Sequence, residues 1–97
     1  MPRACPPLTP DEVIVILLAR GFTLDRESGS HATYQAIIRG KKRSVTVDKH
    51  YLQFDVRRIK DMIAQSGFTR KEFYGSTKRT AKKINLRAKK YPISIGE

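Results

Sequence analysis

The sequence has 97 residues, 39% of them hydrophobic and 30% charged, and its 20 Lys and Arg against 9 Asp and Glu give a formal net charge of +11. This length predicts one small domain, which buries only about 60 to 65% of its unfolded surface. Such a domain has one core and no deep cleft between two lobes. We therefore exclude an enzyme with a separate cofactor domain.

The positive charge is concentrated in the second part of the chain. Residues 1–38 carry three Arg and four acidic residues, whereas residues 39–90 carry seventeen Lys and Arg and four acidic residues. This asymmetry is typical of proteins that bind a polyanion, most often a nucleic acid. No segment pairs a basic face with a strongly apolar face, so a membrane is not the expected partner.

Cysteine and histidine are too sparse to indicate a disulfide or a metal site. Cys5 is the single cysteine, and no Cys/His cluster has the spacing of metal ligands, so we expect a protein of the reducing cytoplasm without metal or cofactor. The longest apolar run, residues 13–19, is too short to cross a bilayer and follows acidic residues, unlike a signal peptide. Residues 1–8 contain three prolines, and we expect them to form a flexible lead-in.

The first expected element is a helix that begins after Thr9. The residues Thr9-Pro10-Asp11-Glu12 have the pattern of a capping box with proline at the first helical position. Apolar residues continue to Leu18, and Gly21 supplies the left-handed stop. They lie around most of the helix, so we expect the helix to pack against a sheet.

Residues 22–47 alternate in polarity, and turn signals at residues 28–30 and 39–42 divide them into three short strands. An antiparallel meander with one apolar and one open, polar face is the simplest arrangement. The apolar face would carry Phe22, Leu24, Ala32, Tyr34, Ala36, Ile38, Val45 and Val47. The open face would carry Asp25, Glu27, His31, Thr33, Gln35, Ser44, Thr46, Asp48 and His50.

Two further capped segments follow. Asp55 can cap a helix that ends at Gly67, and the residues Thr69 to Glu72 form a second capping box that opens a short helical turn. The order helix, three strands, helix predicts an α+β domain over residues 9–74, with the helices on one face of the sheet, an arrangement shared by the double-stranded RNA-binding domain. Residues 75–97 form a basic extension. Its stretch 76–90 holds seven Lys and Arg and no acid, and we expect it to be helical at most on contact with a partner.

His31 is the main catalytic candidate. An imidazole on the open face can act as a general acid or base at neutral pH, and His50, expected on the same face, could supply the second proton transfer that phosphodiester cleavage requires. The alternative for each is an ordinary surface histidine. Arg39, Lys41, Lys42 and Arg43 form either a solvated hairpin tip or a phosphate-binding cluster, and the charge of +11 favours the phosphates.

Residues 13–73 resemble the HicA toxins, small messenger-RNA-cleaving proteins of bacterial and archaeal toxin–antitoxin pairs. The resemblance rests on the Ser-Gly-Ser-His element at residues 28–31, the Val-Thr-Val run at residues 45–47 followed by His50, and residues 59–73. It implies that His31 is catalytic and that a HicB-like antitoxin is the partner. HicA proteins often have proline where this chain has Asp48, and their minimal pattern has no counterpart of the segment after Gly75.

The sequence thus predicts a metal-independent endoribonuclease toxin that cleaves messenger RNA. In this hypothesis His31 does the acid–base chemistry, and Ser30 or Ser28 orients it or the phosphate. The RNA backbone would be bound by Arg39, Lys41, Lys42, Arg43, Lys82, Lys83 and Arg87. Two alternatives stay open: a non-catalytic RNA-binding module of the same fold, and a basic accessory protein that acts through its tail.

Overall fold

The computed structural model describes residues 5–95 and confirms the α+β class with an open, three-stranded antiparallel sheet in the order β1-β2-β3. The elements in chain order are α1 (Pro10–Ala19), β1 (Thr23–Ser28), β2 (His31–Ile38), β3 (Lys41–Asp48), α2 (Val56–Ser66), α3 (Arg70–Tyr74), α4 (Lys78–Ala81) and a 3₁₀ turn (Lys82–Ile84). None of the helices in this described range has the length and apolar content needed to cross a bilayer.

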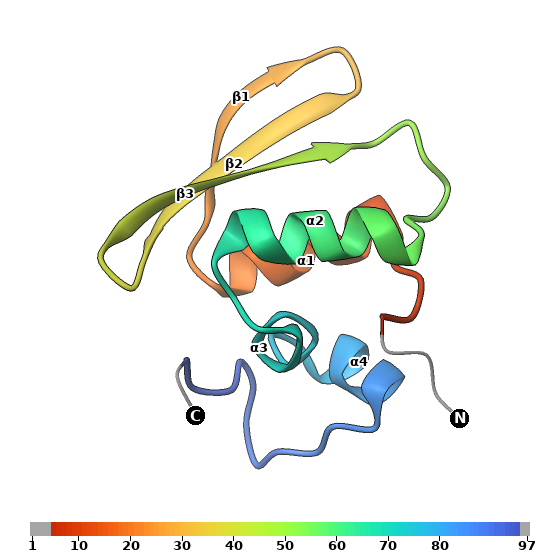
Figure 1. Ribbon diagram of the computed structural model, residues 1–97, viewed down its shortest axis with the longest axis vertical. Helices are drawn as coiled ribbons and strands as arrows, with labels where there is room; N and C mark the ends of the chain where they lie inside the picture. Colours follow the sequence, from red (N-terminus) through yellow and green to blue (C-terminus); the bar gives the residue numbers. More distant parts are fainter. Residues whose placement is uncertain (1–4, 96–97) are drawn as a thin grey trace.

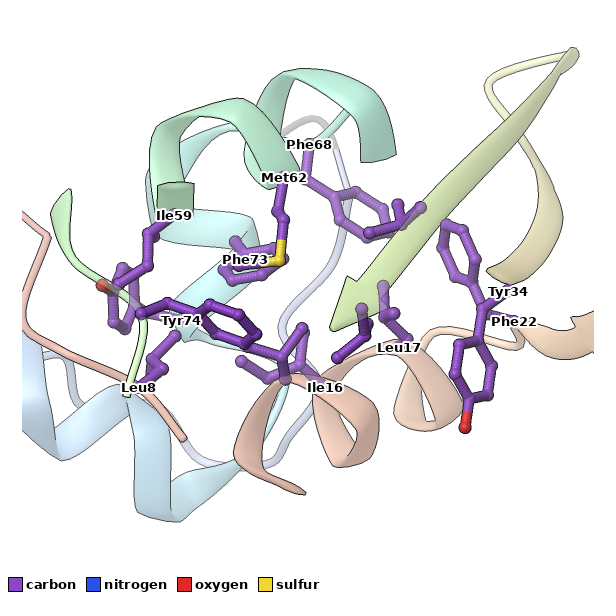
Figure 2. Close-up of a cluster of buried hydrophobic side chains, with 14 of the residues drawn as sticks. Leu8, Ile16, Leu17, Phe22, Tyr34, Ile59, Met62, Phe68, Phe73 and Tyr74 are labelled. Atoms are coloured by element: carbon purple, nitrogen blue, oxygen red, sulfur yellow. The ribbon is translucent and has the colours of Figure 1, made fainter. Parts of the chain in front are cut away.

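The elements form layers around one core. Both α1 and α2 pack against β3, and α3, α4 and the C-terminal segment lie on the side of these helices away from the sheet (Figure 1). Figure 2 shows the cluster of buried side chains that joins the helices, including Ile16 and Leu17 of α1, Ile59 and Met62 of α2, and Phe73 and Tyr74 of α3. Tyr34, expected in the core, is buried.

The capping residues determine the helix ends as the sequence predicts. At α1, Thr9 Oγ1 accepts a hydrogen bond from the Glu12 amide at 3.2 Å, and the Glu12 carboxylate accepts one from the Thr9 amide at 2.9 Å. Asp55 caps α2, which ends at Gly67 with φ +80°. The positive φ favours glycine there, and a Cβ atom would also lie 2.7 Å from Nε of Arg43, so a side chain would have to displace the Arg43 guanidinium.

The turn between β2 and β3 is shorter than the sequence suggested. Arg39 (φ +52°) and Gly40 (φ +80°) are its two central residues, and positive φ at both positions is typical of a type I′ hairpin turn. Lys41 and Lys42, which we expected in the turn, are therefore the first residues of β3. The two-residue turn sets a register in which Ile38 lies opposite Lys41 and His31 lies opposite Asp48.

The facial assignment of β1 was wrong beyond Leu24, because a register shift lies between Leu24 and Arg26. After the shift Glu27 lies opposite Ala32 and therefore shares the helix-facing side, not the open face. Leu24 does lie opposite Tyr34, but it is 51% exposed because the helices pack mainly under β3.

The two chain ends, as far as they are described, pack on the domain. Of the expected flexible lead-in, residues 1–4 lie outside the described residues, whereas Cys5 and Leu8 are buried and the Phe54 amide donates to the Leu8 carbonyl at 2.8 Å. The prediction for the basic extension was also wrong. Residues 78–84 are helical, Thr80 and Ala81 are buried, and the Ile93 amide returns to the domain by donating to the Gly75 carbonyl.

A buried carboxylate connects these layers. Glu72 of α3 is 1% exposed, caps its own helix by accepting from the Thr69 amide, and pairs with Arg39 of the hairpin turn at 2.5 Å. Arg20, which follows α1, donates to the carbonyls of Glu72 (2.7 Å) and Ile93 (2.5 Å). The helix α1, the hairpin turn, α3 and the C-terminal segment are thus joined around one residue.

Arg39→Ala should lower the free energy of unfolding by about 2 to 3 kcal/mol, because it removes the ion pair with the buried carboxylate of Glu72. The value lies below the roughly 3 to 5 kcal/mol that is usual for a fully buried pair because the Arg39 side chain is 40% exposed. Urea denaturation measures it. The control Lys49→Ala breaks a surface pair with Glu27 and should change stability by less than about 1 kcal/mol.

The variant Glu72→Gln combined with Arg39→Ala should lose less stability than the sum of the two single changes, since both changes remove the same ion pair. Strictly additive losses would contradict the proposed role of the ion pair.

Candidate active site

His31 begins β2 and lies directly opposite Asp48, the last residue of β3. Its neighbours Ala32 and Val47 are buried on the helix side, so strand alternation places His31 and Asp48 on the face away from the core, as predicted. Nε2 of His31 lies 3.4 Å from Oδ2 of Asp48, and the imidazole side chain is 62% exposed. An accessible imidazole thus faces a carboxylate.

Two hydrogen bonds hold that carboxylate in place. The amide of His50 and the hydroxyl of Ser30 each donate to Oδ1 of Asp48 at 2.9 Å, which leaves Oδ2 directed at His31. These bonds, that of the His50 amide first and that of Ser30 second, lower the pKa of Asp48 below its ordinary value. Asp48 is therefore a carboxylate throughout the neutral range.

This arrangement has the parts of an acid–base group. A carboxylate next to one ring nitrogen orients an imidazole, selects its tautomer and stabilises the imidazolium, while the other nitrogen exchanges a proton with substrate. Because Nε2 of His31 faces Asp48, Nδ1 is the atom left for substrate. The 3.4 Å separation exceeds the roughly 2.7 to 3.2 Å of a formed N–H···O bond, and such bonds often tighten only when substrate binds.

The three proposed catalytic helpers, Ser28, Ser30 and His50, have different positions and contacts. Ser30 acts on Asp48 and not on the imidazole, and Ser28 lies opposite His31 at the end of β1. His50 follows the end of β3, where its backbone amide holds Asp48. Its imidazole packs edge-to-face against the ring of Tyr51, with the centroids 6.4 Å apart. What His50 brings to the site is therefore its amide.

A groove of about 200 Å³ runs from His31 along the edge of β3 to the flank of α2. Figure 1 shows its frame, in which the end of β3, the segment that follows it and α2 lie next to one another. The groove is lined by His31, Thr46, Asp48, Tyr51, Phe54, Arg58, Asp61, Met62 and Gln65. On α2, Arg58, Asp61 and Gln65 follow each other at helical spacing and form one stripe.

The basic hairpin is remote from His31, which corrects the expected juxtaposition. Lys42 is six positions before Asp48 on β3, so it lies about 20 Å from the imidazole at about 3.3 Å per residue. Arg39 is engaged by Glu72 and by the Gly67 carbonyl. Arg43 lies on the helix side, where its Nε atom is buried against Gly67.

The cations of the C-terminal segment are also separated from the site. The segment that follows α4 and carries Lys82, Lys83 and Arg87 lies in the layer beyond α1 and α2, on the side away from the sheet (Figure 1). Lys83 pairs with Glu12 of α1 at 3.6 Å, whereas Lys82 and Arg87 are exposed. These residues can contact only a part of a polyanion that extends well beyond His31.

The sequence analysis missed most of the residues that line the groove, and Asp48 and Arg58 show why. Asp48 was placed on the open face but given no role, although a two-residue turn at Arg39-Gly40 would have placed it opposite His31. Arg58 was not separated from the other cations of its helix, and only the distance to Tyr51 in the folded chain distinguishes it: its guanidinium lies 4.5 Å from the ring centroid.

The pKa of Asp48 should rise in Ser30→Ala, because one of the two hydrogen bonds that favour the carboxylate is lost. Carboxyl-carbon NMR titration measures it, with Asp25, which lies outside the site, as the internal reference. Because the pKa of Asp48 is lower in the folded protein than in the unfolded chain, its ionisation stabilises the fold. This stabilisation is fully present above the ordinary aspartate pKa of about 3.9, and it is lost as the pH falls through the lower pKa of the folded protein. An unchanged titration of Asp48 in Ser30→Ala would contradict the assigned hydrogen bond.

The described residues contain no group of three or more His, Cys, Asp or Glu side chains that could hold a metal ion. The site is a histidine and an aspartate at the mouth of a small groove. Comparison with known proteins finds no matching family model, no similar curated protein and no similar solved structure. The resemblance to the HicA toxins therefore rests on the sequence motifs alone.

Proposed function

We propose that this protein is an endoribonuclease that cleaves messenger RNA with His31 as its general acid or base. The observation that carries the proposal is the exposed imidazole aligned by Asp48, a carboxylate that is itself held by Ser30 and the His50 amide. Asp48 is a positioning residue, since it acts on the substrate through His31. The net charge of +11 supports a polyanionic substrate.

The proposed reaction uses the 2′-hydroxyl that distinguishes RNA from DNA. Nδ1 of His31 removes the proton of this hydroxyl, whose oxygen forms a bond to the adjacent phosphorus while the bond from phosphorus to the 5′ oxygen breaks. The products are a 2′,3′-cyclic phosphate and a 5′-hydroxyl. Water supplies the proton to the leaving oxygen in this scheme, because the His50 imidazole does not line the groove.

The biological setting is proposed from the sequence motif. The Ser-Gly-Ser-His element and the Val-Thr-Val run resemble those of HicA toxins, so we propose that the protein is the toxin of a type II pair in the cytoplasm. A HicB-like antitoxin would then hold it inactive. A basic toxin favours an antitoxin that is acidic where it covers the site.

A non-catalytic RNA-binding module is the second candidate. It is favoured by the position of the exposed cations Lys42, Lys82 and Arg87, which lie at the far end of the sheet or beyond the helices and not around His31. Such a protein would bind RNA equally well with or without the imidazole. Catalysis and binding therefore have to be measured separately.

His31→Ala should reduce RNA cleavage by about 10² to 10⁴-fold and abolish growth arrest, because general acid–base groups are typically worth that much in rate. RNA binding and thermal stability should stay near wild type, since the side chain is 62% exposed. The matched control is His50→Ala, which keeps the backbone amide that holds Asp48 and should retain most activity. A folded His31→Ala protein that still cleaves RNA would exclude the catalytic assignment, and RNA binding without cleavage by wild type would favour the second candidate.

An oligonucleotide with one 2′-deoxy sugar at the scissile position should bind with unchanged affinity and resist cleavage. Binding depends on phosphates, which are unchanged, whereas the nucleophile is missing. Gel-resolved cleavage and fluorescence anisotropy measure the two effects, with a deoxy sugar one nucleotide away as the control. Cleavage of the first oligonucleotide, or loss of activity in EDTA, would indicate metal-activated water instead.

A further inference from the structure

The groove beside His31 contains polar side chains that neither the fold nor the proposed acid–base chemistry uses. Asp61 and Gln65 are exposed on the flank of α2 that faces the groove, and no hydrogen bond or ion pair links either side chain to the rest of the chain between residues 5 and 95. They lie one helical turn apart, so both can contact one small ligand. These two side chains are available for recognition.

We propose that this groove is a nucleobase subsite that selects the nucleotide next to the cleaved phosphate and prefers a base with an exocyclic amino group over uracil. The proposal deepens the proposed ribonuclease function and rests on it for the position of the cleaved bond. The groove volume of about 200 Å³ is below the roughly 300 to 1,000 Å³ of pockets for drug-sized ligands, which suits a single base and not a duplex.

Tyr51 and Arg58 form one wall of the groove, and their side chains are held in place before any ligand binds. The guanidinium of Arg58 lies over the Tyr51 ring, donates to its hydroxyl at 2.9 Å and is tied to Asp55 at 3.2 Å. Unpaired RNA bases commonly stack on aromatic rings and on arginine planes. A base can therefore stack on this wall without ordering new side chains, while Arg58 supplies positive charge for the adjoining phosphate.

Asp61 supplies the selection. An ionised carboxylate only accepts hydrogen bonds, so it favours the exocyclic amino group of adenine, cytosine or guanine. Uracil has carbonyl oxygens in place of these amino groups and offers only its ring N3–H as a donor, so its pairing edge suits the carboxylate less well. Gln65 can both donate and accept, so it contributes to affinity for every base and discriminates less.

Binding of free mononucleotides tests the subsite without any cleavage step. AMP, CMP, GMP and UMP are titrated into the catalytically silent His31→Ala protein, and the Gln65 side-chain amide and the backbone amides of α2 are followed by NMR. We expect shifts at Gln65, with UMP binding about tenfold more weakly than the tightest amino-bearing nucleotide. Equal affinity for all four nucleotides, or shifts confined to the C-terminal segment, would overturn the subsite.

Asp61→Asn removes the acceptor-only character and should bring the UMP affinity within about twofold of the others, whereas Gln65→Ala should weaken all four. Asp25→Asn is the matched control, since Asp25 is an exposed acid on β1 outside the groove, and it should change nothing. His31-dependent cleavage with no base preference would sustain the ribonuclease and overturn the subsite. Selective nucleotide binding without any RNA cleavage would overturn the ribonuclease and leave a base-binding groove.

Discussion

The buried carboxylate of Glu72 is the constraint on which the arrangement of layers depends. It pairs with Arg39, which sits in the two-residue turn of the β2–β3 hairpin, so the ion pair positions the hairpin against α3. The register of the same hairpin then places His31 opposite Asp48 at its other end. A slip of one residue would turn every side chain to the opposite face and separate the two. The core contact and the candidate site are therefore two ends of one hairpin.

Local signals were sufficient for most of the fold. The capping residues Thr9, Asp55 and Thr69 act within a few positions along the chain, so the sequence alone locates the starts of the helices. Strand alternation correctly placed Tyr34 in the core and His31 on the open face. The first rule depends on local hydrogen bonds and the second on the strand period, which is regular along β2 and β3.

The features that the sequence analysis predicted wrongly share a cause. Each is determined by strand pairing or by contacts between residues distant in sequence. A four-residue turn was expected where Arg39 tolerates positive φ, so the partnership of Asp48 with His31 was not foreseen. The bulge near Asp25 reverses the faces of β1 without any glycine to mark it. The extension looked disordered because of its charge, yet Arg20 binds the Ile93 carbonyl from the other end of the chain.

The exposure of strand β1 bears on whether copies of this protein associate with one another at high concentration. An outer strand offers unpaired backbone groups to which another chain can add, and flat, apolar edges are the ones that aggregate. Here all six residues of β1 are exposed, the bulge interrupts its pairing surface, and Asp25, Arg26 and Glu27 place alternating charges along it. The irregularity and the charges of β1 thus protect this edge against self-association. The strand needs no covering protein to stay unpaired, even where many copies of the chain are present.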